Sequence, residues 1–359
     1  MSGEHEISLE SASSIVRTID KKHKLHLIGI TKQGEWFLHG EKERERIVKN
    51  PKALLKIKKN EDNRVSVMPG GGTKKGLKAG GEFLPTDVVF PVLHGRFGED
   101  GTIQGLFEMA GIPYVGGSVM ASSVSMDKEK TKMLWDYSGL PVVPYIAVKK
   151  RDWLNAEKRQ ALIVEAEKDF DYPLFVKPCN TGSSVGVGKV KNRAELLEQA
   201  EKAFLWDNKI LIETAIDARE IECSVTGNDE ITAYIPGEII PAHNFYDYEA
   251  KYTDPDGAQL KIPADLDETQ RKRVREIAVK AYETLDLSGL SRIDFFIDKK
   301  GKKIYLNEIN TIPGFTSISM FPKMCAASGL PYEKLIMYLL ELAIERFKTA
   351  RTFKSAVKV

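Results

Sequence analysis

The chain has 359 residues, of which 42% are hydrophobic and 29% are charged, and its formal net charge is +2. This length allows a large core in two or three domains, and the balanced charge gives no reason to expect a nucleic-acid partner. Three distant cysteines without a CxxC spacing argue against a disulfide framework or a structural zinc site. No stretch approaches the ~20 apolar residues of a membrane span, and the acidic start is not a signal peptide. We therefore expect a cytoplasmic protein.

The first third of the chain predicts alternating strands and helices. Residues 25–36 indicate a strand, a turn and the start of a second strand. The glycine-rich segment 69–81 predicts an irregular surface loop. Residues 86–95 form a continuous apolar run that ends in turn residues, which is typical of a buried parallel strand, and a helix is expected over residues 101–110. This alternation favours an α/β fold.

The middle of the chain predicts a second unit of strands and helices. A helix is expected over residues 127–140, capped by Asp127 and ended by Gly139 and Pro141. Strands are expected at 172–178 and 209–213, on either side of a helix at 193–204.

The last third predicts a further sheet. Residues 219–227 alternate with period two, so one face of this strand is polar. An amphipathic helix follows over residues 268–285. Residues 292–298 and 303–310 indicate two antiparallel strands, and a final helix is expected over 332–347. We find no internal repeat.

A glycine- and serine-rich segment follows the strand that ends near Lys177. It contains Ser183 and Ser184 among three glycines (Gly182, Gly186 and Gly188). Glycines let backbone amides approach a polyanion, and a lysine on the preceding strand adds positive charge, so the segment favours phosphate binding. The spacing is not that of a P-loop. The alternative is an ordinary hairpin or flexible loop.

Oxygen-bearing side chains lie on the two predicted antiparallel strands near the end of the chain. Asp294 is on the first strand, and Glu308 and Asn310 are two residues apart on the second, so they point to one face. Such oxygen ligands suit magnesium. The alternative is the solvent-facing side of a sheet, but the apolar neighbours and Arg292 favour a metal site.

Two further segments favour ligand chemistry. Residues 313–319 combine a tight turn with three hydroxyl side chains, and the amides near Gly314 could meet a developing oxyanion. Residues 245–254 are both aromatic and charged, which suits a lid with Lys251 facing a phosphate. The alternative for this second segment is an ordinary loop.

These segments resemble, in order, the D-alanine–D-alanine ligases of the ATP-grasp superfamily, and the resemblance covers nearly the whole chain. The excursion over residues 40–85 resembles the larger subgroup that includes the vancomycin-resistance ligases. The motifs that carry the resemblance are EHEISL, HGRFGEDGTIQG, MDKEKTK, KPCNTGSSVGVGKV, FYDYEAKY, RIDFF and NEINTIPGFTSISMFPK.

The resemblance implies a mixed α/β fold of three domains. A Rossmann-like domain with a parallel sheet is expected over residues 1–122, a central ATP-grasp subdomain over 123–214, and a C-terminal subdomain with the metal and substrate sites over 215–359.

The resemblance also implies the reaction. ATP phosphorylates the carboxylate of one D-alanine, the amine of a second D-alanine attacks the acyl phosphate, and the dipeptide serves peptidoglycan synthesis. Two Mg²⁺ ions, or Mn²⁺, are expected on Asp294, Glu308 and Asn310. A homodimer without nucleic-acid or membrane partners is expected.

The resemblance further assigns a role to individual residues. Arg292 and the Gly314 amide match the groups that stabilise the tetrahedral intermediate, and Ser319 and Met320 match the positions that receive the carboxylate of the second D-alanine. The residues expected at the nucleotide are Lys128, Lys177, Ser183, Ser184, Glu213, Glu220, Lys251 and Asn307.

Glu4 matches the glutamate that binds the ammonium of the first D-alanine, linked by hydrogen bonds to Ser183 and Tyr252. The presence of Tyr252 favours the dipeptide over a D-alanyl-D-lactate product. His94 matches a substrate-pocket position, and its alternative is a structural loop histidine.

One departure concerns the start of the chain. Family members begin with an apolar strand and a Gly-Gly turn before the segment at Glu4, and neither precedes it here. We expect a true start roughly a dozen residues upstream, an opened N-terminal core and a poorly held Glu4.

Two alternatives to this function stay open. One is another ATP-grasp ligase, such as a relative that makes D-Ala–D-Ser or D-Ala–D-lactate. The other is a nucleotide-binding remnant that has lost catalysis, although every expected phosphate, metal and oxyanion position is filled.

Overall fold

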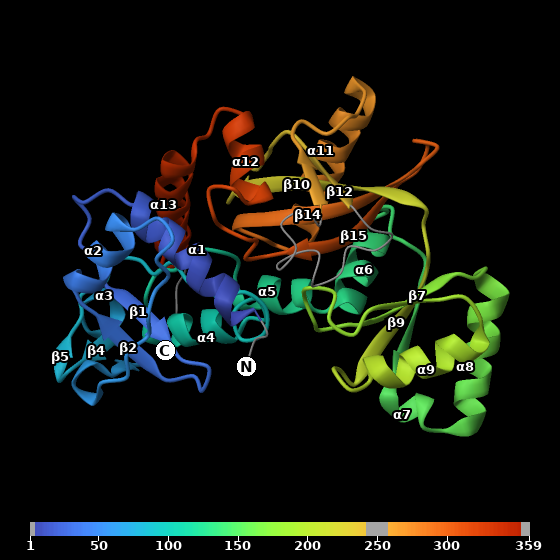
Figure 1. Cartoon of the computed structure of the whole chain (residues 1–359), viewed down its shortest axis with the longest axis horizontal. Helices are drawn as coiled ribbons and strands as arrows, with labels where there is room; N and C mark the ends of the chain where they lie inside the picture. Colours follow the sequence, from blue (N-terminus) through green and yellow to red (C-terminus); the bar gives the residue numbers. More distant parts are fainter. Residues whose placement is uncertain (1–3, 242–257, 353–359) are drawn as a thin grey trace, which may run out of the picture.

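The computed structural model describes residues 4–241 and 258–352 (Figure 1). In these residues the fold is mixed α/β, as expected, with four sheets. Figure 1 shows three groups of elements: the first part of the chain in blue, the middle in green, and the last part in yellow to red. The three domain boundaries proposed from the sequence stay a prediction.

The first group contains two small antiparallel sheets. β1 pairs with β2, which confirms the predicted strand–turn–strand, and β3, β4 and β5 form the second sheet. The predicted helix at 101–110 is confirmed as α4. The elements are α1 (His5–Thr18), β1 (Leu27–Ile30), β2 (Trp36–His39), α2 (Glu41–Lys49), the 3₁₀ helix η1 (Glu61–Asn63), β3 (Val65–Val67), α3 (Gly72–Lys75), β4 (Leu77–Ala79), β5 (Glu82–Phe83), α4 (Thr102–Ala110) and α5 (Val119–Met126).

The prediction of an irregular surface loop over residues 69–81 is wrong. This segment contains α3 and β4, and Leu77 and Ala79 are buried against Val65 and Ile112. Glycines with positive φ stand at its turns rather than inside its strand. Two apolar residues at period two were therefore a stronger signal than the glycine content.

The prediction of a buried parallel strand over residues 86–95 is also wrong. Val89 makes a single parallel bridge with Tyr114, in which the Val89 amide donates to Pro113 O (2.8 Å) and the Val115 amide donates to Val89 O (2.9 Å). Pro91 has no amide hydrogen with which to extend the ladder. The parallel sheet expected in this region is reduced to this one bridge within the described residues.

A cavity of about 1350 Å³ lies in the same region. It is lined by α1, β1, α4, residues 85–98 and one face of α13 (Tyr332–Ala350). Its lining is mostly apolar. The expectation of an opened N-terminal core stays a prediction.

The middle group is a four-stranded antiparallel sheet in the order β6-β9-β7-β8. Apolar side chains of α8 and α9 pack on this sheet, including Ile163, Leu196 and Ala200. Asp127 accepts hydrogen bonds from the Glu129 and Lys130 amides, which confirms the predicted cap of α6. The elements are α6 (Lys128–Tyr137), β6 (Tyr145–Lys149), α7 (Lys150–Trp153), α8 (Ala156–Asp169), β7 (Leu174–Pro178), β8 (Gly188–Val190), α9 (Arg193–Ala203) and β9 (Lys209–Thr214).

The last group is a sheet in the order β13-β12-β10-β14-β15, with β11 on β10. The predicted antiparallel pair is confirmed as β14 and β15, and the polar face of β10 is buried. Apolar residues of α11 and of α12 and α13 pack in two core clusters of this part of the chain. The remaining elements are β10 (Ala218–Gly227), β11 (Thr232–Ala233), β12 (Gly237–Pro241), β13 (Ala258–Lys261), α11 (Glu268–Thr284), β14 (Gly289–Asp298), β15 (Ile304–Asn310) and α12 (Met320–Ala327).

The three cysteines are free, which agrees with the prediction that they form no disulfide framework, and all three are buried. Across residues 4–241 and 258–352, none of the helices is long and apolar enough to cross a membrane.

Candidate active site

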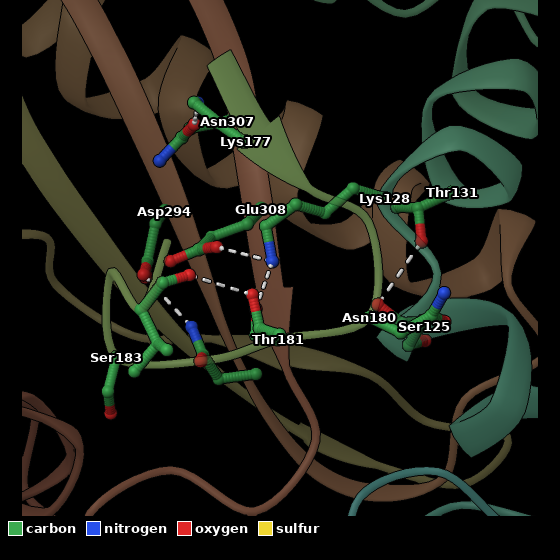
Figure 2. A network of polar contacts seen from close by, with 12 residues as sticks. Ser125, Lys128, Thr131, Lys177, Asn180, Thr181, Ser183, Asp294, Asn307 and Glu308 are labelled. Carbon is green, nitrogen blue, oxygen red and sulfur yellow. Dashed lines mark hydrogen bonds and ion pairs between the residues drawn. The ribbon is translucent and has the colours of Figure 1, made fainter. Parts of the chain in front are cut away.

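A pocket forms where the middle and last sheets approach the first part of the chain. Its walls come from the start of α6, from the glycine- and serine-rich loop after β7, and from the end of β15. Figure 2 shows the polar side chains that gather here. The sequence placed candidate residues on each of these three segments, and the fold brings them together.

Lys128 is the first residue of α6 and reaches across the pocket. Its Nζ donates to Thr181 O at 2.8 Å and lies 3.4 Å from Glu308 Oε2 (Figure 2). The Lys128 amide donates to Cys179 O, which holds the start of the helix against the chain leaving β7. One lysine therefore joins the loop to the predicted metal strand.

Lys177 on β7 lies beside a buried ion pair. Its Nζ is 2.6 Å from Glu213 Oε2 on β9 and donates to Asn307 Oδ1 at 3.1 Å. Glu213 Oε1 is 3.1 Å from Lys132 Nζ, and both side chains are only 1% exposed. Burial alone raises the pKa of Glu213, but the two lysines outweigh burial and lower it, so Glu213 is held ionised.

The glycine- and serine-rich loop has an unusual backbone. Ser183 and Ser184 have φ of +50° and +58°, in the left-handed region that few non-glycine residues adopt. Gln199 on α9 donates to Gly186 O at 3.0 Å, and Thr181 donates to Val185 O at 3.1 Å. A strained backbone held by neighbours favours ligand binding over an ordinary flexible loop.

Ser183 meets Glu4 at the edge of this loop. The Ser183 hydroxyl donates a hydrogen bond to Glu4 Oε1, as the resemblance implied. The expectation that Glu4 is poorly held is therefore wrong for this structure. Glu4 directly precedes α1, and this helix is tied down because His5 Nε2 lies 2.9 Å from Ile30 O and Ser8 Oγ accepts from the His94 amide.

The three predicted metal ligands lie together on β14 and β15. Asp294 and Glu308 are Cα partners in the ladder, next to a register shift, and Asn310 Nδ2 donates to Asp294 Oδ2 at 2.9 Å. In the part of the chain that the structure describes, no three His, Cys, Asp or Glu side chains gather as a metal site. The third donor here is an amide, and two carboxylates with one amide fit Mg²⁺, which completes its shell with water and phosphate.

Arg292 lies next to these carboxylates. Its guanidinium binds Asp294 in bidentate fashion, with both N–O distances at 2.7 Å, and lies 3.2 Å from Glu222 Oε2. Burial disfavours its charge, but Asp294 and Glu222 raise the pKa of Arg292 well above its usual range. The guanidinium is thus fixed as a cation at the end of the pocket.

The segment after β15 carries the predicted oxyanion and carboxylate positions. Ser319 Oγ accepts from the Thr316 amide at 3.1 Å and lies 3.4 Å from the point where a Cβ would stand on Gly314. Ser319 and Met320 begin α12, but the Met320 side chain is buried in the core. Anything that Met320 offers a ligand must come from its backbone amide at the helix N-terminus.

His94 lies behind this segment rather than open to the pocket. Its Nδ1 is 2.7 Å from Ile312 O and its Nε2 is 2.9 Å from Ser11 Oγ. The neighbouring Glu99 accepts from the Gly95 and Ile312 amides at 2.8 and 3.0 Å. Burial, helped by the charge of Glu4, raises the pKa of Glu99 to about 8.

The other predicted residues have different outcomes. Glu220 on β10 is the cross-strand partner of Phe296, whose ring centroid lies 5.9 Å from Lys177 Nζ. Lys251 and Tyr252 lie outside the described residues, so their placement stays a prediction.

Sequence reasoning missed four residues that hold the site together: Lys132, Glu222, Glu99 and Ser11. Lys132 had a signal, because it lies four residues after Lys128 and so on the same side of a helix. Glu222 also had one, because it lies two residues after Glu220 on a strand. The sequence carried no comparable signal for the partners of Glu99 and Ser11, which depend on long-range packing.

Two family models match the chain in order. The model described as D-ala D-ala ligase N-terminus matches residues 1–117, and the model described as D-ala D-ala ligase C-terminus matches residues 134–341. The chain belongs to the D-alanine–D-alanine ligase family.

Relatives and solved structures agree with this assignment. A D-alanine–D-alanine ligase of Treponema denticola is 75% identical over 354 residues, which cover 99% of this chain and 96% of that protein. The structure of the D-alanine–D-alanine ligase from Coxiella burnetii has a TM-score of 0.82 at 36% identity, covering 98% of this chain and 93% of that one. The VanG D-Ala:D-Ser ligase from Enterococcus faecalis has a TM-score of 0.81 at 37% identity, covering 95% and 96%.

Proposed function

We propose that this chain joins two D-alanine molecules in an ATP-dependent reaction that passes through an acyl phosphate and releases ADP and phosphate. The observation that carries the proposal is the meeting of Lys128 and Glu308 at 3.4 Å. This contact places Lys128, which also bonds the glycine- and serine-rich loop, beside a carboxylate of the candidate metal site. The product would feed peptidoglycan synthesis.

The first half of the reaction is phosphoryl transfer. Asp294, Glu308 and Asn310 would hold two Mg²⁺ ions, or Mn²⁺, which neutralise the charge of the transferring phosphoryl group. Lys128 lines the pocket beside Glu308, and Lys177 donates to Asn307, which also lines the pocket; both lysines would bind phosphate oxygens. Without ligands, Arg292 neutralises the charge of Asp294 and Lys128 neutralises that of Glu308. Both cations are therefore already positioned to bind the negatively charged phosphates.

The nucleotide would lie between the middle and last sheets. Ser184 would cover the phosphates, and Glu220 would bind the ribose. We also place Asn307 and Lys251 at the nucleotide. Glu213 is occupied by two lysines and almost fully buried, which supports a role through Lys177 more than direct contact with the base.

The second half is attack of an amine on the acyl phosphate. Glu4, with Ser183 and Tyr252, would bind the ammonium of the first D-alanine. The amine adds to the carbonyl carbon and forms the carbon–nitrogen bond, and Arg292 and the Gly314 amide would stabilise the tetrahedral oxyanion that results. This intermediate then loses the amine proton, and its carbon–oxygen bond to phosphate breaks, which releases phosphate. Ser319 and the Met320 amide would receive the second carboxylate at the start of α12.

A second candidate product is supported by the similarity to a D-Ala:D-Ser ligase at 37% identity. Incubation with ATP, D-alanine and equal D-serine or D-lactate, followed by mass analysis of the products, decides between them. We expect D-alanyl-D-alanine to dominate at neutral pH. Dominance of the mixed product or of the depsipeptide would refute the substrate assignment and the argument from Tyr252.

We also propose that the chain is a homodimer, on the family resemblance alone. Sedimentation velocity at micromolar concentration measures this directly. A single species near 40.2 kDa, the mass of one chain, would contradict the proposal.

A further inference from the structure

The backbone of residues 312–315 is held by side chains from the first part of the chain. The Ile312 amide donates to Glu99 Oε1 at 3.0 Å, and Ile312 O lies 2.7 Å from His94 Nδ1. The Phe315 amide donates to Ser11 Oγ at 3.3 Å. These partners are separated along the chain by 213, 218 and 304 residues.

We propose that Ser11, His94 and Glu99 are positioning residues that fix the backbone on both sides of Gly314. Ser11 and His94 also contact each other, with 2.9 Å between Ser11 Oγ and His94 Nε2. Ser11 and His94 therefore act as one connected support, and Glu99 adds a separate contact to the Ile312 amide. His94 would hold the loop instead of binding the substrate directly.

The chemistry of the partners fixes the direction of each hydrogen bond. A carbonyl oxygen can only accept, so His94 Nδ1 must carry the hydrogen that faces Ile312 O. Burial lowers the pKa of His94, so the imidazole is neutral and its Nε2 is an acceptor. The Ser11 hydroxyl then donates to Nε2, while its oxygen accepts from the Phe315 amide.

This chain of bonds has one consistent arrangement. It runs from the Phe315 amide through Ser11 and His94 to Ile312 O, and so begins and ends on the same loop. Adjacent hydrogen bonds of this kind polarise and strengthen one another. Tyr332 adds a bond from its hydroxyl to Phe315 O at 2.8 Å. Gly314 lies inside the segment that these bonds close.

The link to catalysis rests on the proposed function, because it needs the Gly314 amide to stabilise an oxyanion. A loop displaced by even 1 Å can cost ~100-fold in rate. Substitution of a supporting residue should therefore reduce kcat more than it changes the KM for ATP.

The main test is hydrogen–deuterium exchange of the unliganded chain, which does not depend on activity. In Ser11→Ala, peptides that cover residues 311–316 should exchange roughly fivefold faster or more, because an amide loses its acceptor. Ser13→Ala is the matched control. Ser13 lies on the same helix, is equally buried, and bonds Leu9 O and the Leu55 amide instead of the loop.

Equal exchange of the loop in Ser11→Ala and the unchanged chain would overturn the proposal. An equal increase in both serine variants would also overturn it, because the loop would then report only general destabilisation. Ser11→Thr retains a hydroxyl and should restore at least part of the protection.

Nitrogen-15 spectra of labelled histidine give an independent test of the bond directions. Among the six histidines of the chain, His94 should be the neutral form with the proton on Nδ1, and Ser11→Ala should shift its Nε2 resonance. A proton on Nε2 would contradict the arrangement. If exchange and spectra agree with the proposal but kcat of Ser11→Ala is unchanged, the support exists and the assigned role of Gly314 fails.

Discussion

Ser183 donates a hydrogen bond to the carboxylate of Glu4, although 179 residues separate the two along the chain. The contact joins the segment before α1 to the glycine- and serine-rich loop, and so joins the proposed ammonium site to the proposed phosphate site. Glu4 also makes the first backbone hydrogen bond of α1, because its carbonyl oxygen accepts from the Ser8 amide. An ammonium group bound to Glu4 would therefore lie next to a carboxylate that also holds the Ser183 loop.

Glu4→Gln tests the ammonium site. Loss of the negative charge should raise the KM for the first D-alanine and lower kcat/KM ~100-fold, as is typical when a charged hydrogen bond of ~3 kcal/mol is removed. The KM for ATP should change little. Glu10→Gln, an exposed position of the same helix, is the control. Unchanged D-alanine kinetics in Glu4→Gln would remove Glu4 from the site.

Lys132→Met tests the buried ion pair behind Lys177. Removal of one partner of a buried pair typically costs about 3 kcal/mol, because the remaining charge stays desolvated. We therefore expect a lower free energy of unfolding in urea denaturation. We also expect a raised KM for ATP, because Glu213 then pairs with Lys177 alone and holds this lysine away from the phosphates. Lys130→Met, exposed on the same helix, should change neither quantity.

The double variant Lys132→Met, Glu213→Gln tests whether Lys132 and Glu213 act as a pair. With both charges removed, part of the lost stability should return, whereas the KM for ATP should stay raised because Lys177 has lost its partner. Additive losses of stability would mean that Lys132 and Glu213 do not act as a pair.

Glu99 predicts how stability depends on pH. Its pKa is about 8 in the folded chain and 4.5 as the ordinary value, so the folded state binds this proton more tightly. Its contribution to stability is fully present below pH ~4.5 and is lost as pH rises through about 8. Melting temperatures measured in EDTA between pH 4.5 and 8.5 should fall less steeply for Glu99→Gln. Parallel curves for the two chains would contradict this account.

Local patterns were sufficient for much of the fold and the site. The Asp127 cap of α6, the pair β14 and β15 and the polar face of β10 follow from periodicity and turn residues. Asp294, Glu308 and Asn310 could be placed together because strand period and pairing are local rules.

Long-range packing decided the rest. Residues 86–95 had the composition of a parallel strand, but a strand also needs neighbours, and Val89 has one bridge. Lys132 is a polar residue at a fully buried position, and nothing in its neighbours along the chain shows that Glu213 will meet it. Ser11 is one of several serines in α1, and its partner at Phe315 lies in another part of the fold.

The most direct test of the proposed reaction follows one oxygen atom. With ATP, Mg²⁺ and D-alanine labelled with ¹⁸O in its carboxylate, phosphoryl transfer places a labelled oxygen in the acyl phosphate, and amine attack leaves that oxygen on the phosphate. The account predicts one ¹⁸O atom in each released phosphate, in step with the dipeptide formed. Unlabelled phosphate would show that ATP is hydrolysed by water, and would contradict the acyl-phosphate route and the roles assigned to this site.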